Sequence, residues 1–218
     1  LLHVFARGLG AEYRIFSKTA RMADYGVPQD RRRAIIVAIR VNEPCVKQLE
    51  DEGLVPLPCP THAEVPTDGL FPWITLEHWL SLMNYPPLDS KSPESACSDS
   101  DALHFVPHYE GDRYLMVADI PPRSGRNAYQ NSKCHECGRE DVPEGEAYCP
   151  TCGALMRNRP YMKDDDGTYR LVRGFKSSYR RMRHDRPAPT ITTASSHLGS
   201  DYKLHPWENR VLSIRECA

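Results

Sequence analysis

The chain has 218 residues, of which 40% are hydrophobic and 26% are charged, as in ordinary globular proteins. This length predicts one or two domains, and the net charge of −1 excludes a histone-like polybasic chain. A local basic patch remains compatible with nucleic-acid binding. The longest aliphatic run, residues 34–39, is far shorter than the ~18 residues of a membrane span, and no secretory signal is visible, so we expect a cytoplasmic protein.

The first elements in chain order are two strands and a helix. Apolar side chains alternate over residues 12–17 and predict a strand. Glycine and proline predict a loop over residues 25–33, and the β-branched run at residues 34–40 predicts a buried strand. Apolar residues at helical spacing predict an amphipathic helix over residues 74–83, with Thr75 as its N-cap.

The second half of the chain is predicted to be less regular. The polar residues 86–101 indicate a mobile surface loop, whereas residues 114–120 and 168–173 are typical of strands. The prolines of residues 186–193 predict an extended segment. A helix is predicted to follow Ser213, because the glutamate three residues later completes a capping box.

Four of the eight cysteines form two C-x-x-C pairs, and these are Cys134, Cys137, Cys149 and Cys152. In each pair one tight turn presents both sulfurs to a single ion, and four thiolates form the closed tetrahedral shell of a structural zinc site. Two disulfides or a metal cluster are the alternatives, and His135 is a possible substitute ligand. We predict a zinc ribbon over residues 130–158 that depends on metal for folding, because its polar neighbours bury little apolar surface.

Three consecutive arginines precede the predicted buried strand. In an extended chain, Gln29, Arg31 and Arg33 point to the same side, where a guanidinium fork reaches a base edge or a phosphate. The alternative interpretation of this cluster is a solvated basic turn.

A second basic stretch lies near the C-terminus and is interleaved with aromatic residues. Its members are Arg170, Arg173, Lys176, Arg180, Arg181, Arg183 and Arg186. This mixture suits binding to a nucleic-acid backbone. An exposed helix face, balanced by the three aspartates at residues 164–166, is an equally good interpretation.

Three motifs, taken in order, resemble the cytosine-C5 DNA methyltransferases. Residues 23–39, ADYGVPQDRRRAIIVAI, resemble the Q-x-R-x-R motif of that family. Residues 186–193, RPAPTITT, are similar to its R-P-x-P-T-I-T segment, and residues 205–218, HPWENRVLSIRECA, to its H-P-x-x-x-R-x-L-(S/T)-x-R-E-x-A signature. The resemblance covers residues 1–40 and 175–218, and the insert between them corresponds by position to the family's target-recognition region.

The resemblance implies methyl transfer from S-adenosylmethionine to C5 of a cytosine that is flipped out of duplex DNA. In this family a cysteine thiolate adds to C6 and makes C5 nucleophilic. The family's glycine-rich cofactor loop, its Pro-Cys-Gln nucleophile loop and its Glu-Asn-Val segment do not occur in this sequence. We therefore expect the C-terminal portion of a longer enzyme, with the cofactor bound by a missing N-terminal part and no activity of this chain alone.

Residue by residue, the resemblance implies that Gln29, Arg31 and Arg33 belong to the catalytic site. Arg33 is expected near the flipped cytosine, and Arg31 near the active-site loop and the DNA backbone. The basic stretch and the R-P-x-P-T-I-T segment are expected to contribute further contacts. The complete set of expected DNA-binding residues is Arg31, Arg33, Arg180, Arg181, Arg183, Arg186, Thr190 and Thr192.

The expected fold class is α+β, with end strands of a Rossmann-like methyltransferase sheet followed by an irregular target-recognition domain that contains the four-cysteine zinc ribbon. Residues 1–42 are expected to belong to the catalytic domain, residues 43–193 to the target-recognition domain, and residues 194–218 to a return segment that begins a helix. We expect the ribbon to brace its domain, and double-stranded DNA of the bacterial nucleoid to be the partner. The alternative is a non-catalytic zinc-ribbon module that binds nucleic acid.

Overall fold

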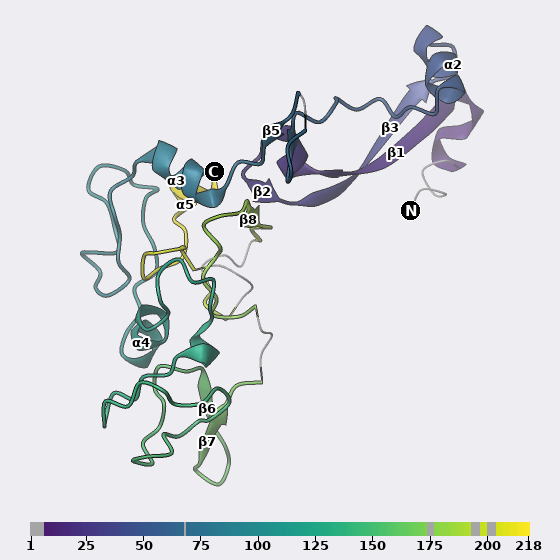
Figure 1. Ribbon diagram of the computed structural model, residues 1–218. Helices are drawn as coiled ribbons and strands as arrows, with labels where there is room; N and C mark the ends of the chain where they lie inside the picture. The colour runs from purple at the N-terminus through teal and green to yellow at the C-terminus, as the bar shows by residue number, and fades with distance from the viewer. Residues whose placement is uncertain (1–6, 68, 174–176, 193–196, 200–203) are drawn as a thin grey trace. The chain divides into compact units, whose positions relative to one another are not determined.

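A computed structural model describes residues 7–67, 69–173, 177–192, 197–199 and 204–218. The chain divides into two compact units, Leu1–Ile74 and Thr75–Ala218. Both combine short helices with small two-stranded sheets, so the mixed α and β composition is confirmed (Figure 1). The domain boundaries that the motifs suggest, at residues 42 and 193, stay a prediction about function.

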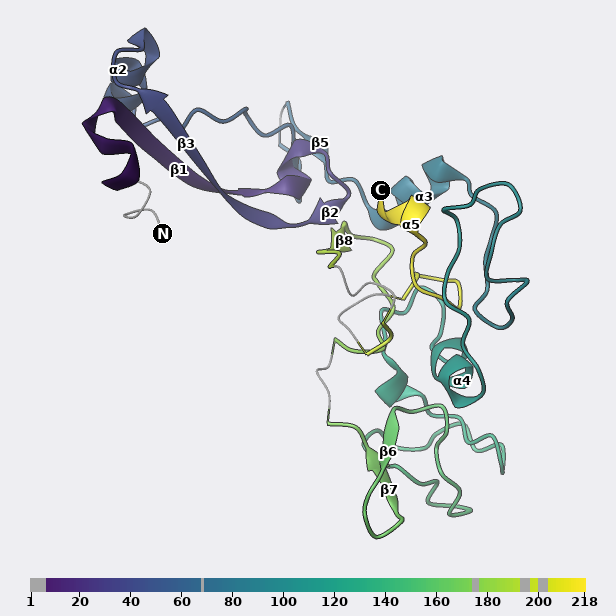
Figure 2. The ribbon, with the colours of Figure 1, turned by 180° about the vertical axis from the view of Figure 1, so that it is seen from behind.

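The first unit is built on a long antiparallel hairpin, seen from both sides in Figures 1 and 2. Strand β1 (Tyr13–Arg21) pairs with β3 (Arg32–Arg40) along its whole length. Both predicted strands are therefore present, and both are longer than predicted. The apolar side chains of β3 are half-buried or exposed, in contrast to the predicted buried strand, because β1 is its one neighbour within the described residues of this unit.

The remaining elements of the first unit are short. They are η1 (Gly10–Glu12), η2 (Met22–Tyr25), β2 (Gln29–Asp30), α2 (Pro44–Asp51), β4 (His62–Ala63) and β5 (Phe71–Pro72). Helix α2 was not predicted, although Pro44 at its first turn is a signal for a helix start, because proline has no N–H to leave unbonded there. Strands β4 and β5 pair in parallel.

The second unit holds four helices of eight residues or fewer in the part of the chain that the structure describes. Its elements are α3 (Leu76–Met83), α4 (Asp112–Ala118), η3 (Ala128–Gln130), β6 (Tyr161–Lys163), β7 (Tyr169–Leu171), β8 (Ala188–Pro189) and α5 (Ile214–Cys217). The Thr75 hydroxyl accepts the His78 N–H at 3.2 Å, which confirms the predicted cap. The capping box of Ser213 and Glu216 is also present, with both of its hydrogen bonds.

Two predictions for this unit are wrong. Residues 114–120 form helix α4 and its end instead of a strand, because Met116, Val117 and Ile120 bury one helical face in the core. Tertiary packing thus overrides the strand propensity of valine and isoleucine. Residues 86–101 do not form a purely exposed loop, since Leu88 and Ala96 are packed into the same core.

Three arginine side chains of the second unit are fully buried, namely Arg159, Arg181 and Arg210. Arg181 donates to the carbonyls of Val117 and Ile120 at the end of α4, at 3.2 and 2.9 Å. It also donates to the His205 carbonyl at 3.0 Å, to the Glu208 carbonyl and to the Asn209 amide oxygen at 2.7 Å.

This arrangement corrects one prediction from the sequence. Arg181 is not available to DNA, because its guanidinium is enclosed and its donors are used by five acceptors of the protein. Burial lowers the pKa of Arg181 to about 10, so the group is still a cation at neutral pH. Its positive charge lies where the α4 dipole is negative, which favours it there.

Arg210 forms a second buried centre with the C-terminal helix. Its guanidinium donates to both carboxylate oxygens of Glu216, at 2.6 and 2.8 Å, and to Glu208 at 2.7 Å. His205 lies beside this pair, with Nδ1 accepting the Glu208 N–H at 3.0 Å and Nε2 at 3.9 Å from a Glu216 oxygen. Burial lowers the pKa of His205 well below its ordinary value, and the nearby cations Arg210 and Arg181 add to the effect.

Arg181→Ala is expected to destabilise the second unit by about 3–5 kcal/mol, because five buried acceptors lose their donor. Arg183→Ala, two residues away, is the matched control: its side chain is 55% exposed and pairs with Asp185, so the unfolding midpoint in urea should hardly change. Equal midpoints for the two variants would contradict the structural role of Arg181.

The stability of the second unit is expected to fall as the pH drops below about 6.5, because the unfolded chain protonates at His205 while the folded chain keeps this ring neutral. One such group gives a slope of at most about 1.4 kcal/mol per pH unit. Denaturant titrations between pH 7.5 and 5 measure this slope. His205→Asn, whose side-chain oxygen can still accept the backbone N–H, should flatten it, and an unchanged slope would show that other groups cause it.

Candidate metal centre and nucleic-acid interface

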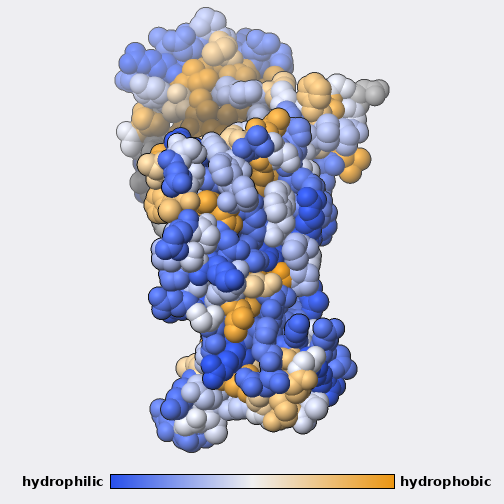
Figure 3. All heavy atoms as spheres, turned by 90° about the vertical axis from the view of Figure 1, so that its left-hand side faces the viewer, coloured by the Kyte–Doolittle hydropathy of each residue, from blue (hydrophilic) through white to orange (hydrophobic). Residues whose placement is uncertain are grey.

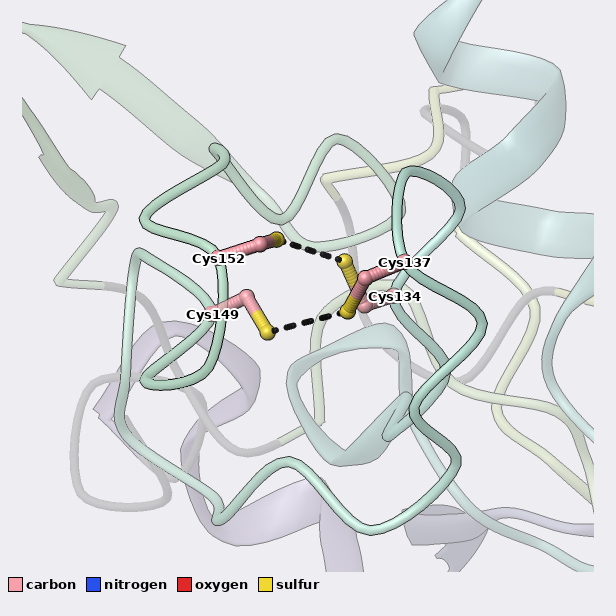
Figure 4. A group of neighbouring side chains, drawn as sticks. All are labelled: Cys134, Cys137, Cys149 and Cys152. Carbon is pink, nitrogen blue, oxygen red and sulfur yellow. Dashed lines mark hydrogen bonds between the residues drawn. The ribbon is translucent and has the colours of Figure 1, made fainter.

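The four predicted metal ligands come together in the second unit (Figure 4). The Sγ atoms of Cys134 and Cys152 are 3.7 Å apart, as are those of Cys137 and Cys149, and all four lie within 4.8 Å of one another. A tetrahedron with Zn–S bonds of about 2.3 Å has edges of about 3.8 Å, whereas a disulfide needs about 2.05 Å. The cluster is therefore compatible with zinc, and the four cysteines are free of disulfides.

Two matching turns hold the sulfurs. The N–H of Gly138 donates to the Cys134 carbonyl at 3.0 Å, and the N–H of Gly153 donates to the Cys149 carbonyl at 2.8 Å. Both glycines have positive φ, 76° and 74°, which a side chain would strain. Figure 4 shows the two pairs facing each other from separate loops.

The ionisation of each thiol in the cluster depends on the neighbouring sulfurs. Burial opposes ionisation of Cys149, but backbone N–H groups of Cys152 and Thr151, together with neighbouring sulfurs, lower its pKa to about 6. The pKa of Cys152 is raised to about 12 despite a backbone N–H that favours its thiolate, because burial and the neighbouring sulfurs oppose a second negative charge. A divalent cation supplies the charge that lets all four sulfurs ionise together.

Arg159 braces the loop between the two cysteine pairs, a role that the sequence did not reveal. Its guanidinium donates to the carbonyls of Asn131, Val142, Pro143 and Glu146, at distances of 2.6 to 2.9 Å. These four carbonyls belong to residues that form no helix or strand, so the buried arginine supplies the donors that a sheet would otherwise provide.

His135 does not join the cysteine cluster. Its Nε2 lies 2.6 Å from the Asp119 carboxylate, just beyond the end of α4. The same carboxylate oxygen accepts from the Asn158 amide at 2.6 Å, and that amide also reaches the Lys133 carbonyl. These contacts attach the ribbon to α4, and the expected bracing role stays a prediction.

The arginine turn lies in the first unit and joins β2 to β3. Arg33 is exposed, and its guanidinium donates to the neighbouring Arg32 carbonyl at 2.8 Å. Arg31 and Gln29 are half-buried, and the Arg31 backbone is fixed by bonds to the Gln29 carbonyl and from the Met22 N–H. Arg33 is the second residue of β3, so it is presented to solvent from a strand that is paired with β1.

An ion pair that the sequence analysis missed fixes this turn. Arg21 forms two bonds of 2.6 Å with Asp30, which raise the pKa of the arginine. The Arg21 guanidinium also lies 4.0 Å from the centre of the Trp73 ring, and the indole N–H donates to Asp24 at 2.9 Å. The alternating charges around the turn indicate that ion pairs form there, but sequence spacing alone does not identify which residues pair.

Position 26 of the arginine turn requires a glycine. Its φ is 80°, and a Cβ there would lie 2.8 Å from the His62 ring, so the position requires glycine for two reasons. The His62 Nδ1 and the Thr61 hydroxyl are 2.8 Å apart, and the Thr61 N–H donates to the Asp24 carbonyl at 2.9 Å.

The basic stretch of the second unit is not a helix over its described residues 177–186, so the helix-face interpretation is wrong there. Arg180 donates to the Gly125 carbonyl at 2.6 Å, and a Cβ on Gly125 would lie 3.1 Å from the Arg183 side chain. Arg180 and Arg183 therefore both pack around the turn at Gly125. Arg186 is exposed.

Two further expected contacts lie on the extended segment that follows. Thr190 is half-buried and Thr192 is exposed. Lys176 lies outside the described residues.

Comparison with known families identifies this chain. The sequence model of the C-5 cytosine-specific DNA methylases matches residues 6–218. The chain belongs to the C-5 cytosine-specific DNA methylase family. This confirms the family that the three motifs indicate, and favours the methylase over the non-catalytic zinc-ribbon module.

One relative of this methylase chain is the "Type II methyltransferase M1.HgaI" of Avibacterium volantium. The two are 43% identical over 54 residues, which make up 21% of this chain and 15% of the relative. The chain thus spans about one-seventh of the length of the curated relative that it matches. Among the described residues of the methylase chain, no helix has the length and apolar character of a membrane span.

Removing the metal with a chelator is expected to unfold the ribbon locally, because residues 130–158 contain few apolar contacts beyond the cluster of Val142, Met156 and the cysteines. Amide resonances of the ribbon should lose dispersion, while those of the β1–β3 hairpin serve as the internal control. Zinc content by atomic absorption should fall to zero in parallel. Full dispersion without metal would contradict this expectation.

Proposed function

We propose that this chain is the C-terminal part of a DNA (cytosine-5-)-methyltransferase, which transfers a methyl group from S-adenosylmethionine to C5 of cytosine in duplex DNA. The main support for this proposal is that the sequence model of the family matches residues 6–218. The similarity to a type II methyltransferase supports a place in a restriction–modification system, acting on DNA in the bacterial cytoplasm.

The hairpin of the first unit supports an assignment of residues 1–42 to the catalytic domain. Ile35, Val37 and Ile39 point to one face of β3, and Ala34, Ile36 and Ala38 point to the other. Apolar residues on both faces are typical of strands that helices cover on both sides, as in a Rossmann-like sheet. We therefore assign β1 and β3 to the end of such a sheet, whose remaining part binds the cofactor.

Arg33, Arg31 and Gln29 are proposed to act at the flipped cytosine. The cofactor supplies the electrophilic methyl group when it is bound. Arg33 is exposed at the start of the paired strand β3, directly after the arginine turn, so its N–H groups are placed to donate to the base or its phosphate from a fixed backbone. The Arg21–Asp30 pair positions this turn and does not itself need to touch DNA.

Residues 43–193 are proposed to recognise the DNA target, with residues 194–218 returning toward the catalytic domain. Arg180, Arg183, Arg186, Thr190 and Thr192 remain as proposed DNA contacts. The cysteine cluster is proposed to hold structural zinc, since four thiolates leave no open coordination position for chemistry.

Arg33→Ala in the complete enzyme is expected to abolish cytosine methylation while duplex binding is largely retained, because the lost contact is to one extruded base. Bisulfite sequencing of plasmid DNA measures the methylation, and fluorescence anisotropy the binding. Arg32→Ala is the matched control, since successive strand residues face opposite sides of β3. Equal methylation by the Arg33 variant and the wild type would show that Arg33 does not belong to the catalytic site.

A further inference from the structure

The second unit contains a basic hollow that none of the family motifs includes. The hollow has a volume of about 600 Å³ and is bordered by Arg170, Arg173 and Arg180, with Tyr129 and Glu144 also on its wall. These residues define the basic hollow. Its size falls within the range of sites that hold small organic groups.

Four segments build the walls of the basic hollow, and one of them contributes Arg180. Arg170 belongs to β7 and Arg173 follows that strand, Tyr129 belongs to η3, and Glu144 comes from the loop between the two cysteine pairs. The ribbon and β7 are directly connected, because the Tyr169 N–H donates to the Tyr148 hydroxyl at 2.8 Å. Both lie at the same end of the unit in the two ribbon views (Figures 1 and 2).

Two of the three guanidinium groups are anchored on their Nε side. Arg170 donates from Nε to Asp164 at 2.6 Å, and Arg180 donates from Nε to the Gly125 carbonyl at 2.6 Å. Arg180 is also tied through its backbone, which forms a bridge with Asn127. Anchoring reduces the conformational entropy that an arginine loses when it binds an anion.

The charges of the wall favour an anion. Three arginines line the wall, and the acidic groups beside them are Glu144 and Asp164, of which Asp164 pairs with Arg170. The Glu144 carboxylate accepts a hydrogen bond from the Gln130 amide at 3.0 Å. Arg173 is exposed, and the structure shows no acidic partner for it among the described residues. The Tyr129 ring and the aliphatic side chains of Leu171 and Val172 add flat apolar surface next to the cations.

We infer that the basic hollow binds phosphodiester groups of the DNA backbone, an inference that rests on the proposed function. Guanidinium groups bind phosphate oxygens through paired N–H bonds, and contacts to the backbone position a protein without reading sequence. In this arrangement the metal-dependent ribbon supplies one wall of a phosphate site, although the metal itself takes no part in the contact.

The test compares Arg173→Gln, the Arg173→Gln/Arg180→Gln pair and Arg157→Gln in the purified protein. Arg157 is the matched control, because its side chain is 62% exposed and lies outside the hollow. Binding to a target duplex and to an unrelated duplex is measured at several salt concentrations. Each lost phosphate contact should lower the affinity for both duplexes alike, by about 10-fold. It should also reduce the slope of log affinity against log salt concentration by about 1. Arg173→Lys should keep the salt slope.

Four outcomes overturn the inference. If the wild type binds DNA and the double variant has the same affinity and salt slope, the basic hollow is not a phosphate site. The proposed function is then unaffected. A loss confined to the target duplex shows that these arginines read bases. Failure of the wild type and of Arg157→Gln to bind any duplex, or displacement of DNA by equimolar inorganic phosphate, rejects the DNA backbone as the ligand.

Zinc content and the thermal unfolding midpoint of each variant verify folding. If the double variant does not fold, the single Arg173→Gln variant decides the test, because Arg173 is exposed and carries no hydrogen bond that the structure describes.

Discussion

Buried guanidinium groups that satisfy backbone carbonyls are the constraint on which the second unit depends. Its helices and strands are short, so many carbonyls lack the partners that a long helix or a sheet supplies. Arg159 fills this role for the ribbon loop and Arg181 for the end of α4 and residues 205–209. Arg210 joins the last helix through Glu216. Arg159 and Arg181 connect segments that are distant in sequence, whereas Arg210 fixes the local approach to the last helix.

The same constraint decides which arginines of the basic stretch are able to meet DNA. Arg180, Arg181 and Arg183 lie within four residues, yet Arg181 points into the core while Arg183 is exposed. Regular strand alternation would place residues 181 and 183 on the same side. The segment forms isolated bridges at Arg180 and Arg181 and no regular strand, so one short stretch serves both the core and the surface. The cysteine cluster contributes in a comparable way, because it fixes the loops that carry one wall of the basic hollow.

The sequence predicted those features that depend on neighbouring residues. The caps at Thr75 and Ser213, the β1 and β3 strands and the two cysteine pairs follow from local spacing, and the structure confirms them. Helix α4 was mistaken for a strand, because its buried face is set by tertiary contacts. Arg159 and Arg181 were beyond prediction for the same reason: a charged residue that satisfies remote carbonyls has the same local pattern as a surface cation.

Hydrogen exchange at the arginine Nε–H groups, followed by NMR, tests this account most directly. The Nε–H of Arg181 should exchange only through opening of the second unit, whereas that of the exposed Arg183 should exchange rapidly and provide the internal reference. Similar rapid exchange at both positions would contradict a core organised around enclosed arginines.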